Sequence, residues 1–135
     1  MVEALARKPG ALAYVELLHA LRMKLMFGAV KNKAGKFILA DLQGVTKAAE
    51  NSLKNIPEDL RFSLTDADGD DSYPISGTTW AVDYVDQNPE TGRLLFDFFT
   101  WATHEGQKYN EDMHYAKLPE PLVQRIDEKL KKIKK

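Results

Sequence analysis

The chain has 135 residues, of which 44% are hydrophobic and 29% charged, a composition typical of a globular domain with one core. Its 19 Lys and Arg residues nearly balance its 20 Asp and Glu residues, and the resulting net charge of -1 argues against a nucleic-acid partner. The absence of cysteine excludes disulfides, thiolate catalysis and cysteine-ligated metal centres.

The first predicted elements are a helical turn, a strand and a helix. Val2, Leu5 and Ala6 share one side of a helical turn that Pro9 and Gly10 bring to an end. A short buried strand is predicted over residues 11–15. The helix that follows extends to about residue 25, because apolar residues repeat there at helical spacing: Leu17, Leu18, Leu21 and Leu25.

A hairpin and a capped helix come next. Residues 26–30 and 37–39 flank the polar turn 31–36, in which Gly35 can adopt a positive φ angle. Asp41 is the predicted N-cap of a helix that ends near Asn55 and Pro57. The apolar positions of this helix are Leu42, Val45, Ala49 and Leu53.

Two further strands are predicted on either side of a turn-rich loop. Residues 61–65 form a short strand, and residues 66–72 form the loop. Residues 74–86 are rich in β-branched and aromatic side chains and are interpreted as one long strand.

The C-terminal part of the chain is predicted to be helical. Asn88 as cap, Pro89 at the first position and Glu90 in the first turn open a helix, which Gly106 interrupts. The side chains it should bury are Leu94, Leu95, Phe98, Trp101 and Ala102. Leu118 and Pro119 introduce a last helix with an apolar stripe made of Leu122, Val123, Ile126, Leu130 and Ile133.

The acidic loop at residues 66–71 has some features of a calcium site, because alternating carboxylates can surround a hard cation. Counted from Asp66, however, Asp71 stands where an EF-hand needs its glycine, and Gly77 stands where it needs a bidentate glutamate. We therefore interpret the loop as a solvated turn and expect no metal site.

Ser76, Gly77 and Thr78 are weak candidates for phosphate contact, because hydroxyl groups beside a small residue can approach an anion. Such groups bind phosphate when they precede a helix N-terminus, whereas here they open a predicted strand. The preferred interpretation is a strand edge or a crossing between lobes.

No catalytic constellation is present, so we expect neither an enzyme nor a cofactor. His19, His104 and His114 lack the spacing of metal ligands, and no serine lies on a Gly-x-Ser-x-Gly turn. Five lysines at the C-terminus could face an anionic surface, but the favoured alternative is that they complement the negative end of a helix: Lys129, Lys131, Lys132, Lys134 and Lys135.

Six short stretches, in this order, resemble the phosphate-binding proteins of phosphate ABC importers. They are Lys8–Glu16 (KPGALAYVE), Asn32–Lys36 (NKAGK), Asp71–Trp80 (DSYPISGTTW), Asp86–Gln87 (DQ), Gly106–Tyr109 (GQKY) and Tyr115–Pro119 (YAKLP). The resemblance covers essentially the whole chain but only the C-terminal part, under half, of a family member. Two positions depart from the family pattern: Met1 stands where members continue a helix, and Asp83 stands at a strand position that is usually apolar.

The resemblance implies an α/β fold: the C-terminal part of a two-lobed type 2 periplasmic-binding-protein fold, with a mixed sheet and flanking helices. It implies that residues 1–75 belong to one lobe, residues 76–86 are a long strand in the hinge region, and residues 87–135 complete the other lobe with helices. In the family, serine and threonine hydroxyls, helix-end amides, an arginine and an acid hold the phosphate. Those residues lie upstream of this segment, and Ser76–Thr78 does not align with the family's own Ser-Gly-Thr site.

The function implied by the resemblance is that of a phosphate-binding subunit of an ABC importer, represented by its C-terminal segment. The alternative is a stand-alone interaction or scaffold protein derived from half of the binding fold. The expected partners are the missing N-terminal half or a second copy of the chain, with phosphate and the membrane permease engaged through the full-length protein. The resemblance implies a periplasmic or cell-surface location, although Met1–Gly10 lacks the features of a signal peptide.

Overall fold

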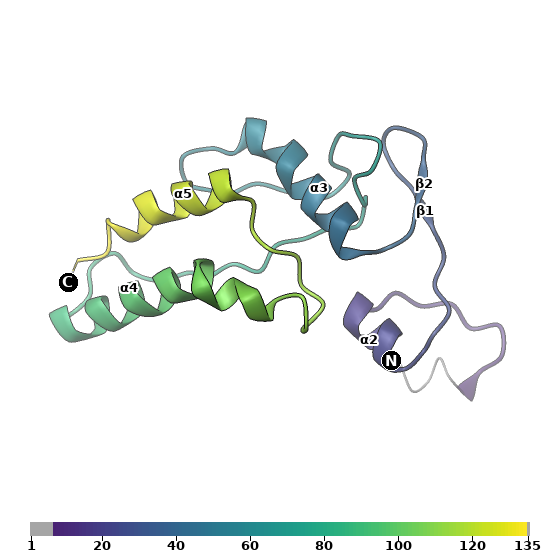
Figure 1. Cartoon of the computed structure of the whole chain (residues 1–135), viewed down its shortest axis with the longest axis horizontal. Coiled ribbons are helices and arrows are strands. Elements are labelled where there is room, and N and C mark those ends of the chain that lie inside the picture. The colour runs from purple at the N-terminus through teal and green to yellow at the C-terminus, as the bar shows by residue number, and fades with distance from the viewer. Residues whose placement is uncertain (1–6, 135) are drawn as a thin grey trace.

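Helices provide most of the regular structure in the computed structural model, which describes residues 7–134 (Figure 1). In chain order the elements are α2 (Leu17–Arg22), β1 (Val30–Lys31), β2 (Phe37–Ile38), α3 (Leu42–Ser52), the 3-10 helix η1 (Leu53–Asn55), α4 (Pro89–Thr103), the 3-10 helix η2 (Glu105–Tyr109) and α5 (Glu120–Leu130). The fold is α/β with a small two-stranded sheet. Within residues 7–134, no helix is both long and apolar enough to cross a membrane.

The N-terminal segment differs from the prediction. The turn assigned to Val2, Leu5 and Ala6 lies outside the described residues, but Gly10 does adopt a positive φ of 78°. Residues 11–16 form no strand, and Leu12 is 97% exposed. The predicted buried strand over 11–15 is therefore wrong: no neighbouring strand pairs with this segment in the described chain, and an unpaired strand gains neither hydrogen bonds nor burial.

Helix α2 is confirmed but ends at Arg22, earlier than predicted. Lys24 follows with a φ of 51°, and the Leu25 amide donates to the Ala20 carbonyl at 2.9 Å. This left-handed residue with its backward hydrogen bond is a common way to satisfy the last carbonyls of a helix.

The hairpin and the capped helix are confirmed. β1 and β2 pair antiparallel with Val30 opposite Ile38, and Gly35 has a φ of 81° in the turn. The Asp41 carboxylate accepts a hydrogen bond from the Gly44 amide at 2.6 Å and so caps α3. Ala48 on α3 is fully buried and belongs to the core.

The two strands predicted over 61–65 and 74–86 are not formed. Both segments lack a backbone ladder, although they approach each other where the rings of Phe62 and Trp80 meet edge to face at 5.4 Å. The sheet of the described chain consists of β1 and β2 alone, so the predicted larger mixed sheet is also not formed within this chain. A strand needs a partner strand, and β-propensity alone does not supply one.

Helix α4 begins as predicted, because the Asn88 side chain accepts a hydrogen bond from the Thr91 amide at 2.9 Å. Its burial differs from the prediction: Leu94, Phe98 and Trp101 are 60%, 56% and 45% exposed. The helix ends at Thr103, before Gly106, which lies inside η2. One face of α4 packs on α5, and η2 packs against the ring of Trp101, whose centroid lies 6.3 Å from that of Tyr109.

Helix α5 is confirmed and contributes three buried apolar side chains to the core. Leu122, Val123 and Leu130 are buried, in agreement with the predicted stripe. The Arg125 guanidinium donates to the carbonyl of Ile56 at 2.8 Å, which connects α5 to the end of η1. Other buried apolar residues lie on α2 (Ala20), at the end of η1 (Ile56) and in the segment that follows it (Leu64 and Ala67).

Candidate functional site

Ser76, Gly77 and Thr78 do not converge on a common point in the structure. The Ser76 hydroxyl is buried and donates to the Tyr73 carbonyl at 2.8 Å, so it serves the local turn. Gly77 is exposed, and a Cβ added to it would meet no described atom within 4 Å, whereas Thr78 is half-buried. These residues precede an extended segment rather than a helix.

The acidic loop 66–71 is held in place by Asn32, a residue whose role has no signal in the local sequence. Asn32 is 5% exposed, and its side-chain amide donates to the carbonyls of Gly69, Asp70 and Ser72 at 3.2, 2.8 and 3.2 Å. Its side-chain oxygen accepts from the Lys36 amide at 2.9 Å. One buried amide therefore joins the hairpin turn to the loop.

A second set of hydrogen bonds joins the loop to α3. The Asn51 side-chain amide donates to the Ser72 hydroxyl at 3.0 Å, and that hydroxyl donates to the Asp68 carbonyl at 2.6 Å. Gly69 has a φ of 108°, and a Cβ there would lie 2.3 Å from Asn51 Nδ2. The loop thus needs glycine at this position for two separate reasons.

The carboxylates of this loop do not gather around a point. Asp68 forms an ion pair with Lys33 at 2.7 Å. The hydrogen bond and the charge of Lys33 lower the pKa of Asp68, and those of Asp68 raise the pKa of Lys33. Within residues 7–134, no three or more His, Asp or Glu side chains are grouped as a metal site requires.

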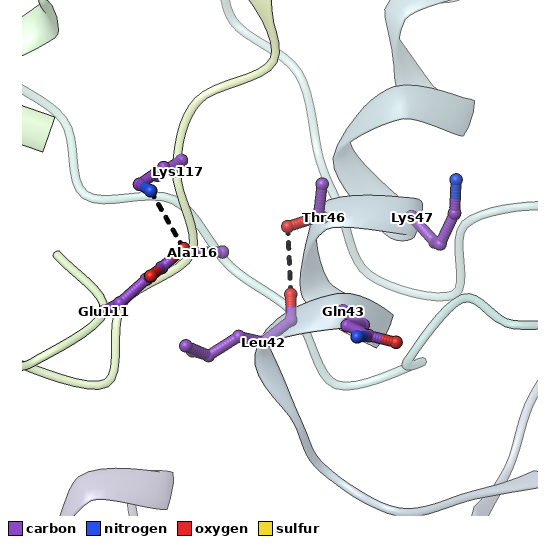
Figure 2. Close-up of a pocket in the computed structure, with 7 residues that line it drawn as sticks. All are labelled: Leu42, Gln43, Thr46, Lys47, Glu111, Ala116 and Lys117. Atoms are coloured by element: carbon purple, nitrogen blue, oxygen red, sulfur yellow. Dashed lines mark hydrogen bonds and ion pairs between the residues drawn. The ribbon is translucent and has the colours of Figure 1, made fainter. Parts of the chain in front are cut away.

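A groove of about 330 Å³ lies between the first turns of α3 and the segment that follows η2 (Figure 2). Its lining residues are Leu42, Gln43, Thr46, Lys47, Glu111, Ala116 and Lys117. The Thr46 hydroxyl donates to the Leu42 carbonyl at 2.9 Å and is therefore engaged within the helix. Because the groove lies beside a helix N-terminus, it is the natural place in the described chain to look for anion binding.

The charges around this groove are already neutralised. Lys117 pairs with Glu111 at 2.9 Å, and Lys47 pairs with Glu50 at 2.8 Å, a contact that raises the pKa of Lys47. The Gly44 amide at the start of α3 already donates a hydrogen bond to the Asp41 carboxylate. An anion at this helix end would meet a carboxylate there, and like charges repel. The groove can accept an apolar group, but it is poorly suited to phosphate.

The three histidines are dispersed. His104 Nε2 lies 3.4 Å from the Asp127 carboxylate, across a groove between α4 and α5, and its Nδ1 lies 2.9 Å from the Thr100 carbonyl. His19 is 3.9 Å from Glu16, and His114 occupies a left-handed position with a φ of 57°. They share no ligand or reaction centre.

The C-terminal lysines are engaged by carboxylates. Lys132 and Lys129 reach Glu58 at 3.0 and 3.8 Å, and the hydrogen bond and charge of Lys132 lower the pKa of Glu58. Lys131 pairs with Glu128, and Lys134 pairs with Asp86. Lys129, Lys132 and Lys134 thus join the C-terminal end of α5 to neighbouring loops, the Lys131–Glu128 pair lies within that helix end, and Lys135 lies outside the described residues.

Comparison with known proteins supplies the family relationship. No family model matches the chain. A phosphate-binding protein PstS of Xylella fastidiosa (strain Temecula1) is 30% identical over 119 residues, which are 87% of this chain and 33% of that protein. A phosphate-binding protein PstS of Methanocaldococcus jannaschii is 35% identical over 128 residues, and the match covers 85% of this chain and 33% of that protein. One from Pasteurella multocida is 29% identical over 117 residues.

These matches cover most of this chain. The chain spans about a third of the length of the curated relatives it matches. Five of these relatives carry the name phosphate-binding protein PstS. The resemblance of this chain to the PstS phosphate-binding proteins is therefore confirmed over most of its length.

Proposed function

We propose that this chain forms the C-terminal part of a phosphate-binding subunit of an ABC phosphate importer. The observation that carries the proposal is the similarity to PstS proteins over 87% of the chain. In this proposal the protein acts in transport rather than catalysis. It works at the periplasmic or outer face of the membrane and delivers phosphate to a permease.

We further propose that the phosphate contacts come from outside this segment. A protein that binds dehydrated phosphate must replace the lost water with converging donors and positive charge. Lys47 and Lys117, the cations beside the groove at α3, are each paired with a carboxylate. The Ser76 hydroxyl donates to a backbone carbonyl instead of pointing into a cavity. These contacts support a structural role for the segment.

The division into lobes remains part of the proposal. Residues 1–75 would complete one lobe of a type 2 binding fold, residues 76–86 would cross between the lobes, and residues 87–135 would complete the other. The contacts of the hairpin, α3 and the acidic loop support a first unit, and the packing of α4 on α5 supports a second. Residues 76–84 connect the two as an open trace (Figure 1).

Calorimetry with inorganic phosphate tests the proposal. The pure 135-residue chain should show no micromolar binding. Co-expression with a polypeptide that matches the remaining two thirds of a relative should produce a complex that does bind. Ser76→Ala combined with Thr78→Ala should leave binding by that complex unchanged. Micromolar binding by the chain alone, lost in this double variant, would place the site at Ser76–Thr78 instead.

The alternative function is that of a stand-alone interaction protein, and it is favoured by one observation. Leu94 and Phe98 on α4 are 60% and 56% exposed, as expected of apolar side chains at a protein interface. The two functions differ in the reconstitution experiment. If the chain is a scaffold protein, it and the complementary polypeptide should each be folded, yet their mixture should not bind phosphate.

A further inference from the structure

The acidic loop contains the bond between Asp68 and Gly69, and the sequence has no other Asp-Gly pair and no Asn-Gly pair. An aspartyl bond to glycine is the one most prone to rearrange spontaneously, because glycine has no side chain to shield its nitrogen or to restrict its backbone. The residue types alone therefore make this bond the weakest aspartyl linkage of the chain.

The rearrangement requires only water. The Gly69 nitrogen bonds to Cγ of Asp68, and the carboxyl hydroxyl leaves with the amide hydrogen as one water molecule. Water then opens the cyclic imide. Attack at Cγ restores aspartate, whereas attack at the backbone carbonyl carbon breaks the original peptide bond and leaves the chain joined through Cγ, as isoaspartate. The water lost in the first step returns in the second, so the mass of the chain is unchanged.

We propose that Lys33, Asn32 and Ser72 protect the Asp68–Gly69 bond from isomerisation to isoaspartate. Ring closure has two requirements. The carboxyl must be protonated, because an ionised carboxylate has no hydroxyl group to lose as water. The peptide group that follows it must also turn until its nitrogen faces Cγ. Contacts within the described chain oppose each requirement separately.

Lys33 opposes protonation. Its ammonium group lies 2.7 Å from the Asp68 carboxylate. The hydrogen bond and the charge of Lys33 favour the ionised form and hold the pKa of Asp68 below its usual value. The reactive, protonated carboxyl is therefore less populated than it would be without Lys33.

Hydrogen bonds on both sides of the bond oppose its rotation. The Ser72 hydroxyl donates to the Asp68 carbonyl at 2.6 Å, and the Asn32 side-chain amide donates to the Gly69 carbonyl at 3.2 Å. Gly69 also packs closely on Asn51, since a Cβ added to it would lie 2.3 Å from Asn51 Nδ2. The peptide group is thus held from both ends, and turning it would break these contacts.

Isomerisation would disrupt the same contacts. It inserts Cβ of Asp68 into the main chain, so one more atom separates the Asp68 Cα from the Gly69 nitrogen. Asn32 donates to the carbonyls of Gly69, Asp70 and Ser72 in their present spacing. A longer main chain would shift these carbonyls relative to one another and would weaken the connection between the hairpin turn and the loop.

Peptide mapping by mass spectrometry, after long incubation at neutral pH, measures isoaspartate at this position. Lys33→Gln should raise its rate of formation about two- to fivefold, the factor that corresponds to the loss of an exposed ion pair. Molar salt should bring the parent close to this variant, because it screens the pair. Lys36→Gln, a change in the same turn, is the matched control. An unchanged rate in Lys33→Gln, or an equal rise in Lys36→Gln, overturns the proposal.

Asn32→Ala tests the hydrogen bonds, and Leu122→Ala, at a buried position on α5, is the control for stability. Both changes lower the free energy of unfolding, but only Asn32→Ala releases the loop, so it should accelerate isomerisation more. The parent unfolded in urea gives the rate without protection. Equal acceleration by the two variants, or a native rate equal to that in urea, overturns the proposal. No phosphate site enters these tests, so failure here leaves the proposed function untouched.

Discussion

Asn32 donates its side-chain amide to the Asp70 carbonyl at 2.8 Å, and so joins a hairpin turn to a loop 38 residues further along the chain. Two more carbonyls, those of Gly69 and Ser72, share the same donor group. A buried amide with this many partners is costly to remove, because all three carbonyls lose a donor at once.

Asn32→Ala should lower the free energy of unfolding by about 2 to 3 kcal/mol, the cost of leaving buried polar groups unsatisfied. Asn32→Asp should cost more near neutral pH, because a carboxylate would face three carbonyl oxygens, and less below about pH 4, where the new carboxyl is protonated. Urea unfolding measures both. Lys31→Ala, an exposed change in the same hairpin, is the control, and an equal loss in all three variants would contradict the prediction.

Gly69→Ala should destabilise the protein by about 2 kcal/mol or more, because it combines a strained backbone with a steric clash. The φ of Gly69 is 108°, and the new Cβ would lie 2.3 Å from Asn51 Nδ2. Gly77→Ala is the matched control, since a Cβ there meets no described atom within 4 Å, and it should change stability by less than about 0.5 kcal/mol. Thermal unfolding of the two variants side by side should show the contrast.

Lys33→Gln should raise the pKa of Asp68, which the Lys33 hydrogen bond and charge hold below its usual value. A carboxyl with a lowered folded-state pKa adds stability above its unfolded pKa of about 3.9, and that stability is lost as the pH falls through the lower folded value. The difference between variant and parent should therefore vanish in strong acid. A carboxyl NMR titration follows Asp68 directly. Lys36→Gln, a change in the same turn, should leave the titration midpoint of Asp68 unchanged.

Millimolar calcium should leave the melting temperature nearly unchanged. Asp68 already pairs with Lys33, and the carboxylates of the loop do not converge on a common point among the described residues. A ligand that binds only the folded state raises the melting temperature by an amount that grows with the logarithm of its concentration above the Kd, so scanning calorimetry with and without a chelator is decisive. A rise of several degrees, abolished by Asp68→Ala, would reveal a calcium site.

The features that can be predicted from sequence are those whose cause is local. Asp41 and Asn88 are recognisable as caps because a cap bonds within three residues of itself. Gly35 is recognisable because its turn requires a positive φ. The contact of Asn32 with the acidic loop is not, since the three carbonyls to which its side-chain amide donates lie 37 to 40 residues away.

The wrong predictions have a common physical cause. Residues 11–15, 61–65 and 74–86 have the composition of strands, but a strand forms only when another strand pairs with it. Leu94 and Phe98 follow helical periodicity on α4, yet the periodicity shows only that an apolar face exists, not that another element covers it. Both errors concern contacts that the described chain does not make with itself. The relatives, three times as long, offer many more residues with which to make them.

The hydrogen bond from the Lys134 amide to the Val85 carbonyl, at 3.0 Å, brings together the two ends of a fifty-residue stretch that holds α4, η2 and α5. Val85 is 52% exposed, and the Lys134 side chain is 71% exposed, so both positions can carry a dye. A fluorophore pair at these two positions would transfer energy efficiently while the ends remain joined. A fall in energy transfer would show that residues 85 and 134 have separated. It would therefore report unfolding of the stretch that holds α4, η2 and α5, and not unfolding of the β1–β2 hairpin.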